Sequence, residues 1–262
     1  KGYDATLLAS RRSDRREDRD AFVAWRSYLG TEALRRFRLF PTFGIMYRSM
    51  NRYHLVTLGC QMNISDSERI VTVLERMGYA RTEREEEADL IGVVACSVRQ
   101  KAIDKVYGMI HRWNEWKNER RLITFVTGCI LPTDREKFLK RFDLVFPITE
   151  LPSLPEMIRR YGVASPAALH TEGEELDDDY WHVPPTYSSG AEAYVPIQNG
   201  CDKFCTFCAV PYTRGREVSR PSTEILREVE AHIDAGYRSI TLLGQNVNSY
   251  GLDRRSGEIR FP

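Results

Sequence analysis

Residues 195–215 read Val-Pro-Ile-Gln-Asn-Gly-Cys-Asp-Lys-Phe-Cys-Thr-Phe-Cys-Ala-Val-Pro-Tyr-Thr-Arg-Gly. Three cysteines, Cys201, Cys205 and Cys208, follow a short apolar run at the spacing Cys-x3-Cys-x2-Cys. Three thiolates on one tight loop can bind three irons of an iron–sulfur cube, and the fourth iron then has no protein ligand. Because an iron with an open position can bind a small molecule, the loop is interpreted as catalytic.

Zinc is the alternative occupant of this loop. Structural zinc takes four ligands, typically from two Cys-x2-Cys pairs or from one pair and two histidines. The loop offers three cysteines, and the next histidine downstream, His232, falls in a stretch with helical periodicity. We therefore favour an iron–sulfur cluster over zinc, and both over a disulfide.

The composition is that of a globular, core-forming protein, since apolar residues make up 42% of the 262. No apolar run approaches the roughly 18 residues that a membrane-spanning helix needs. The net charge of +1 decides nothing about a nucleic-acid partner. The six cysteines are not accompanied by a secretory leader, so we expect a reducing, cytoplasmic location with metal-binding thiolates rather than disulfides.

Residues 1–49 differ from the rest of the chain. The segment 11–20 is a run of mixed charges without apolar periodicity, which is typical of solvated, disordered chain. Met50 shortly precedes a clean strand pattern, whereas the chain begins with Lys. We expect residues 1–49 to be disordered or a non-native extension without a catalytic role. An arginine-rich organelle-targeting segment is the alternative, and the acidic residues of the segment count against it.

Three short apolar runs each end at a cysteine. The runs are 54–58, 89–95 and 122–127, and the cysteines that follow them are Cys60, Cys96 and Cys129. A single cysteine after a strand is usually a small buried apolar residue. The same placement in three successive units instead predicts a convergent ligand set, which would hold a second cluster with one open iron.

Helical patterns separate these runs. Residues 65–77 and 98–116 carry apolar side chains at helical intervals, with Ser65 or Asp66 as the expected N-cap of the first. A further strand, 142–146, lies between short helices at 134–141 and 154–161. Alternating strands and helices with near-continuous apolar strands predict a parallel sheet covered by helices on both faces. The carboxyl ends of its strands lie at one edge, where ligands bind.

The second half of the chain begins after a linker. Residues 163–190 contain an acidic run and paired prolines. A strand at 194–197, a helix at 223–235 capped by Ser222, and a strand at 238–243 follow. This is the expected opening of a β/α barrel, whose active face lies at the strand carboxyl ends. Closing a barrel takes more strands than these two, so we interpret the chain as truncated.

Five motifs resemble the radical S-adenosylmethionine (SAM) methylthiotransferases, across about residues 51–262. Three of the motifs resemble the N-terminal domain of the family, namely Gly59-Cys-Gln-Met-Asn63, Ala95-Cys-Ser-Val-Arg-Gln-Lys-Ala102 and Gly128-Cys129. The cysteine loop with its continuation Pro211-Tyr-Thr-Arg-Gly-Arg-Glu-Val-Ser-Arg-Pro221 resembles the radical SAM core. Leu243-Gly-Gln-Asn-Val-Asn-Ser-Tyr250 is similar to the tRNA branch of the family.

The resemblance implies C2 methylthiolation of a tRNA adenosine that lies next to the anticodon and already carries an N6-isopentenyl group. It implies two [4Fe-4S] clusters and two uses of SAM, one as methyl donor and one as source of a 5′-deoxyadenosyl radical. The implied partners are the anticodon stem-loop of tRNA and a reductant such as flavodoxin or ferredoxin, with no membrane. The sulfur source stays open. Another branch of the family, acting on threonylcarbamoyladenosine or a ribosomal-protein aspartate, and a non-catalytic iron–sulfur carrier are the alternatives.

The resemblance also implies roles for individual residues. Cys201, Cys205 and Cys208 would bind the radical SAM cluster, and Cys60, Cys96 and Cys129 the auxiliary cluster. Asn63 would orient the auxiliary loop or only cap a turn. Contacts to SAM are expected from Phe207, Gly244 and Gln245, and contacts to the SAM carboxylate or to tRNA phosphate from Arg214, Arg216 and Arg220, for which plain surface charge is the alternative.

The fold class expected from these observations is α/β. Residues 50–162 would form a flavodoxin-like N-terminal methylthiotransferase domain with a parallel sheet. Residues 163–190 would be a linker, and residues 191–262 the N-terminal part of a radical SAM β/α barrel.

Overall fold

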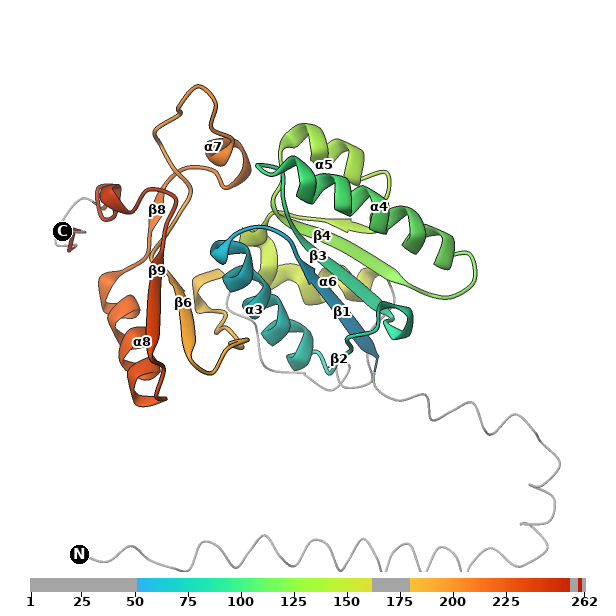
Figure 1. Ribbon diagram of the computed structural model, residues 1–262, viewed down its shortest axis with the longest axis horizontal. Coiled ribbons are helices and arrows are strands. Elements are labelled where there is room, and N and C mark those ends of the chain that lie inside the picture. The colour runs from blue at the N-terminus through green and yellow to red at the C-terminus, as the bar shows by residue number, and fades with distance from the viewer. Residues whose placement is uncertain (1–50, 162–179, 255–258, 261–262) are drawn as a thin grey trace, which may run out of the picture. The chain divides into compact units, whose positions relative to one another are not determined.

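The computed structural model describes residues 51–161, 180–254 and 259–260. The expectations for residues 1–49, and for the part of the linker before residue 180, lie outside these ranges. Figure 1 labels the elements described below.

A five-stranded parallel sheet forms the first part of the fold. Its strands appear in the order β2-β1-β3-β4-β5, and each neighbouring pair is parallel. This is the strand order of flavodoxin-like doubly wound sheets. The strands are β1 (Arg52–Thr57), β2 (Ala80–Arg81), β3 (Leu90–Cys96), β4 (Ile123–Cys129) and β5 (Leu144–Val145).

Helices follow the strands along the chain, as the alternating pattern predicts (Figure 1). Short 3-10 turns occur at Glu85–Glu87 and at Ile148–Ser153. The helices are α3 (Gln61–Arg76), α4 (Gln100–Trp116), α5 (Pro132–Phe138) and α6 (Leu154–Arg160).

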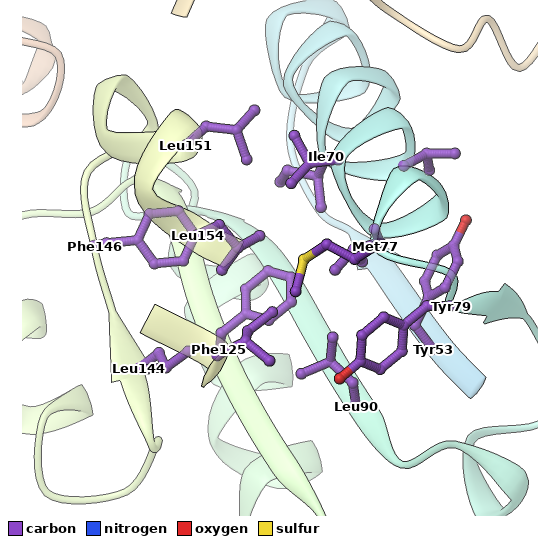
Figure 2. Packing of buried hydrophobic residues seen from close by; sticks show 14 of the residues in the cluster. Tyr53, Ile70, Met77, Tyr79, Leu90, Phe125, Leu144, Phe146, Leu151 and Leu154 are labelled. Atoms are coloured by element: carbon purple, nitrogen blue, oxygen red, sulfur yellow. The ribbon is translucent and has the colours of Figure 1, made fainter. Parts of the chain in front are cut away.

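Alternating side chains of the central strands enter two separate cores, one on each face of the sheet. Leu90 and Val94 of β3 pack with Phe125 of β4 against α3 and α6. Figure 2 shows Leu90 and Phe125 in this core. The intervening residues Ile91 and Val93 pack against α4 and α5 on the other face. Because successive side chains of a strand point to opposite faces and both faces are covered, every residue of β3 and β4 is buried. This explains why β3 is apolar throughout and β4 is apolar except for Thr124 and Thr127.

The second part contains a strand–helix–strand unit. Strands β6 (Glu192–Pro196) and β9 (Ser239–Leu243) pair in parallel, and helix α8 (Ser222–Asp234) lies between them in the chain. A short antiparallel pair, β7 (Gln198–Asn199) with β8 (Val218–Ser219), flanks the cysteine loop, together with the single helical turn α7 (Val210–Thr213). Further 3-10 turns lie at Tyr180–His182 and Val247–Ser249. The barrel itself stays a prediction.

Two expected helix N-caps are wrong. Helix α3 begins at Gln61 with Cys60 as N-cap, so Ser65 and Asp66 lie inside the helix and are buried. Helix α8 begins at Ser222 with Pro221 as N-cap, so Ser222 is the first helical residue. The two-residue strand β2 was not predicted, because it is too short to show periodicity.

The described end of the expected linker packs on α3. Tyr180 is buried and donates from its hydroxyl to Asp66 Oδ1 over 2.6 Å. Ser188 donates from both its backbone N–H and its hydroxyl to Glu68 Oε1, at 2.9 and 2.7 Å. These contacts attach residues 180–188 to the first part of the fold. Among the described helices, none is long and apolar enough to cross a membrane.

Gly92 of β3 leaves space for an aromatic ring, and this yields a stability prediction. A Cβ added at Gly92 would collide with the ring of Phe125, which is fully buried. We expect Gly92→Ala to lower the free energy of unfolding by about 1–3 kcal/mol, as overpacking of a core does. Urea denaturation measures the change.

The control for this prediction is Gly108→Ala on helix α4, where an added Cβ meets nothing within 4 Å. Replacing an open helical glycine by alanine is expected to stabilise the protein by about 0.5–1 kcal/mol. Adding Phe125→Leu to Gly92→Ala should recover part of the loss. Equal stabilities for the two Gly→Ala variants would contradict the proposed packing.

Candidate metal centres

Three cysteines lie at the carboxyl edge of the parallel sheet. Cys96 and Cys129 end β3 and β4 and are register partners. By strand alternation both are on the face that α3 covers, as are Val94 and Phe125. Cys60 follows β1 and is the N-cap of α3. Parallel strand topology thus brings together three cysteines that are separated in the sequence.

The side chain of Asn63 lies between these cysteines. It is fully buried in the first turn of α3, and its Nδ2 donates to the carbonyl oxygen of Ala95 over 2.9 Å. Its Oδ1 accepts from Cys60 Sγ at 3.5 Å and lies 4.0 Å from Cys129 Sγ. Asn63 therefore fixes the position of α3 relative to the ends of β3 and β4, and it contacts two of the three thiols.

Gly128 permits this close packing. Its φ of +106° is one that residues with a side chain rarely adopt, and an added Cβ would lie 2.5 Å from the carbonyl oxygen of Ala95. The Cβ would also approach Asn63 Nδ2 at 3.2 Å. A glycine before Cys129 is therefore a steric requirement of the site.

The thiols of Cys96 and Cys129 influence each other. Their mutual hydrogen bond lowers the pKa of Cys96 to about 6, and the same bond, aided by burial, raises the pKa of Cys129. The pair therefore loses its first proton from Cys96, and the resulting thiolate is stabilised by its neighbour. Since thiolates are the metal-binding form of cysteine, the pair is prepared for metal binding.

The second group of cysteines lies on the loop between β7 and α7. Cys201 is buried, Cys208 half-buried and Cys205 exposed. The loop turns back on itself, since the backbone N–H of Cys208 donates to the carbonyl oxygen of Cys205 over 2.9 Å. Gly200 precedes the first thiol with a φ of +80°, and an added Cβ would collide with the backbone of Arg216. The loop thus carries three cysteines on a locally folded backbone.

The expected SAM contacts near this loop have different surroundings. Phe207 is 94% exposed, so its ring is not part of a core. Gln245 follows β9, and its Oε1 is buried without a hydrogen-bond partner among the described residues. Gln198, which the sequence did not single out, also has a buried Oε1 without such a partner, 3.1 Å from a Cβ placed at Gly244. The sequence signal for Gln198 is only its position before the cysteine loop.

The three arginines expected to contact SAM or phosphate are all paired with protein groups. Arg216 is exposed, pairs with Asp202 and stacks over the ring of Phe204. Arg220 is buried and pairs with Glu224 and Glu228 of α8. Their roles toward SAM or tRNA stay predictions.

Arg214 differs from the other two because it reaches the first group of cysteines. Its Nε donates to Cys129 Sγ over 2.9 Å, and its Nη2 donates to Asp66. Burial disfavours the charge, but the Asp66 carboxylate and Cys129 outweigh it and raise the pKa of Arg214. A cavity of about 280 Å³ opens beside this contact, and its lining includes Gly128, Arg135, Phe146, Asn199, Tyr212 and Arg214.

In the part of the chain that the structure describes, no three His, Cys, Asp or Glu side chains are placed to hold a single metal ion. An iron–sulfur cube does not require three side chains around one ion, because each thiolate binds a different iron. The donor sets of both groups, three thiols each, have that chemistry.

Two family profiles match the chain, one over each part. Residues 52–147 match the uncharacterized protein family UPF0004, and residues 195–256 match the radical SAM superfamily. The first match contains Cys60, Cys96 and Cys129, and the second contains the cysteine loop.

Curated relatives align over both parts together. A tRNA-2-methylthio-N6-dimethylallyladenosine synthase of Geobacter metallireducens is 44% identical over 213 residues, which are 79% of this chain and 48% of the relative. Over these residues the chain is similar to the curated tRNA-2-methylthio-N6-dimethylallyladenosine synthases, and its second part matches the radical SAM superfamily. Synthases of the same name from Halorhodospira halophila and Thermotoga petrophila are each 40% identical over 79% of this chain, and over 44% and 46% of their own lengths. The chain thus spans about half the length of the curated relatives that it matches.

Proposed function

We propose that this protein is a radical SAM transferase that adds a methylthio group to C2 of N6-isopentenyladenosine next to the anticodon of tRNA. The observation that carries the proposal is the division of the six cysteines into two groups of three. One group lies at the edge of a parallel sheet and the other on a loop. The relatives' names, tRNA-2-methylthio-N6-dimethylallyladenosine synthase, support the same activity.

The residues fit the cofactors that this activity needs. Three thiols at each site suit a [4Fe-4S] cluster with one iron left open for another ligand. Cys60, Cys96 and Cys129 would hold the auxiliary cluster, and Cys201, Cys205 and Cys208 the radical SAM cluster. The buried, unpartnered oxygens of Gln198 and Gln245 are acceptors suited to the amino group or ribose hydroxyls of SAM.

When bound, the clusters and SAM supply radical and sulfur chemistry that no side chain offers at an aromatic C–H bond. The residues of this chain would hold these cofactors and orient them. Asn63 fixes the positions of the sheet-edge cysteines, and α3 directs its N-terminus toward them. The partial positive charge of a helix N-terminus favours anionic groups there.

We further propose the architecture and the partners that go with this activity. Residues 50–162 would be the flavodoxin-like domain of the auxiliary cluster, and residues 191–262 the opening of a β/α barrel around the radical SAM loop, joined by the linker 163–190. The tRNA anticodon stem-loop would be the substrate and a flavodoxin or ferredoxin the reductant, in the cytoplasm.

Nucleoside analysis of tRNA tests the proposal. A strain lacking the gene is expected to lose the methylthio group from its isopentenylated adenosines, and the restored gene should return it. Normal methylthio content in the deletion strain, together with a change in threonylcarbamoyladenosine or in a ribosomal protein, would contradict the proposal and assign the chain to another branch of the family.

A further inference from the structure

A buried arginine connects the two groups of cysteines. Arg214 follows the cysteine loop in sequence and ends the helical turn α7, where its backbone N–H donates to the carbonyl oxygen of Val210. Its side chain leaves this segment and donates from Nε to Cys129 Sγ, 2.9 Å away. One residue of the radical SAM segment thus contacts a cysteine at the edge of the other sheet.

The guanidinium is held from several sides. Its Nη2 pairs with Asp66 Oδ2, and its Nη1 donates to Asn199 Oδ1 over 3.1 Å. Tyr180 donates to the second carboxylate oxygen of Asp66 over 2.6 Å. The side chains of Arg214 and Asp66 are 1% and 0% exposed. Each guanidinium nitrogen therefore has a partner, and such a buried, fully paired arrangement holds the donor at Cys129 in a fixed direction.

A purely structural ion pair would not require the sulfur contact. The carboxylate of Asp66 and the amide of Asn199 satisfy two nitrogens, and the third is directed at the sulfur of a cysteine. A lysine could not serve in the same way, because only the planar guanidinium reaches three partners in fixed directions.

We propose that Arg214, held in place by Asp66, is a positioning residue for the auxiliary cluster. The proposal rests on the proposed function, because it assigns Cys129 as a cluster ligand. Arg214 orients the Cys129 sulfur, and its positive charge offsets negative charge on a cluster bound there. Hydrogen bonds to ligand sulfurs and the net charge around a cluster set its reduction potential. Arg214 thus makes the auxiliary cluster easier to reduce.

The test measures the midpoint potential of the auxiliary cluster by redox titration followed by electron paramagnetic resonance. The background is the reconstituted protein with Cys201, Cys205 and Cys208 replaced by alanine, so that only the sheet-edge cluster contributes. Arg214→Met removes a positive charge and is expected to shift the potential downward. Asp66→Asn removes a negative charge, leaves the guanidinium less compensated, and is expected to shift the potential upward.

Both variants break the same ion pair, so a purely structural role would shift the potential in the same direction in both. The proposed role predicts shifts of opposite sign. Arg216→Met is the matched control, because Arg216 lies on the same segment, is exposed and contacts no cysteine of the sheet edge in the described contacts. Its potential should equal that of the unaltered background.

Shifts of the same sign, or no shift in either variant, would overturn the proposal. If Arg214→Met fails to hold iron, Asp66→Asn decides alone: an upward shift supports the proposal, and a downward shift or none overturns it. Unaltered protein that binds no cluster at the sheet edge would overturn both this proposal and the proposed function. Unaltered protein that methylthiolates tRNA, with potentials insensitive to both substitutions, would overturn this proposal alone.

Discussion

Replacing Cys205 by serine is expected to abolish the reductive cleavage of SAM. Loss of one thiolate leaves the loop with two ligands, too few to hold the cluster firmly. We expect at least a ~100-fold fall in 5′-deoxyadenosine formation, because even the partners that only orient metal ligands are worth 10–100-fold. Cys205 is the informative position, since it is exposed, whereas Cys201 is buried and its replacement also disturbs packing.

The measurement is 5′-deoxyadenosine released from SAM after reduction with dithionite. Lys203→Ala is the matched control, because Lys203 is exposed on the same loop and is not a metal ligand. The control should bind as much iron as the unaltered protein. Undiminished cleavage of SAM by Cys205→Ser would contradict the assignment of the loop.

Replacing Cys60 by serine is expected to lower methylthio transfer strongly and to leave the cleavage of SAM largely intact. On the proposed assignment the auxiliary cluster would lose one of its three ligands, so methylthio transfer to tRNA should fall at least ~100-fold, on the same reasoning about metal ligands. Cleavage of SAM should persist within several-fold, since the loop cysteines are unchanged. Cys60 suits this test because it is the N-cap of α3, a position at which serine is favourable, and because it is the least buried of the three.

Iron content, SAM cleavage and nucleoside products are measured on the same preparation of Cys60→Ser. The control is Gln61→Ala, which changes the next residue, an exposed one. Iron should fall by about half in Cys60→Ser and stay unchanged in the control, because one of two four-iron clusters is lost. Retention of full methylthio transfer by Cys60→Ser would exclude Cys60 as a required ligand.

The sheet and the gathering of its cysteines followed from the sequence. Unbroken apolar runs are what strands covered on both faces need, and parallel strands place their carboxyl ends at one edge. Cys60, Cys96 and Cys129 could therefore be expected close together without any knowledge of the loops between them. The role of these thiols as cluster ligands stays a prediction.

The prediction for the start of α3 was wrong because Ser65 and Asp66 have partners elsewhere in the chain. Ser65 and Asp66 are residues that favour N-caps, and local pattern offered no other use for them. In the structure, Ser65 donates to the carbonyl oxygen of Tyr194, and Asp66 pairs with Arg214, 148 positions away. Contacts at that separation leave no periodic trace in a single sequence.

The partners of the arginines after the cysteine loop could not be predicted from the sequence either. The charge of these arginines suggested SAM, phosphate or solvent as surroundings. Arg216 is exposed, whereas Arg214 and Arg220 are buried against carboxylates, and Arg214 also donates to a cysteine sulfur. Buried charges require partners, but the identity of the partner depends on the tertiary fold.

The most direct test of the two-cluster activity is an assay on a defined RNA. An anticodon stem-loop carrying N6-isopentenyladenosine is incubated with the reconstituted, unaltered protein, SAM and dithionite, and the nucleosides are identified by mass spectrometry. The prediction is a methylthio group at that adenosine, accompanied by 5′-deoxyadenosine. Protein that holds both clusters, yet neither cleaves SAM nor alters the RNA, would contradict the proposed function and indicate an iron–sulfur carrier.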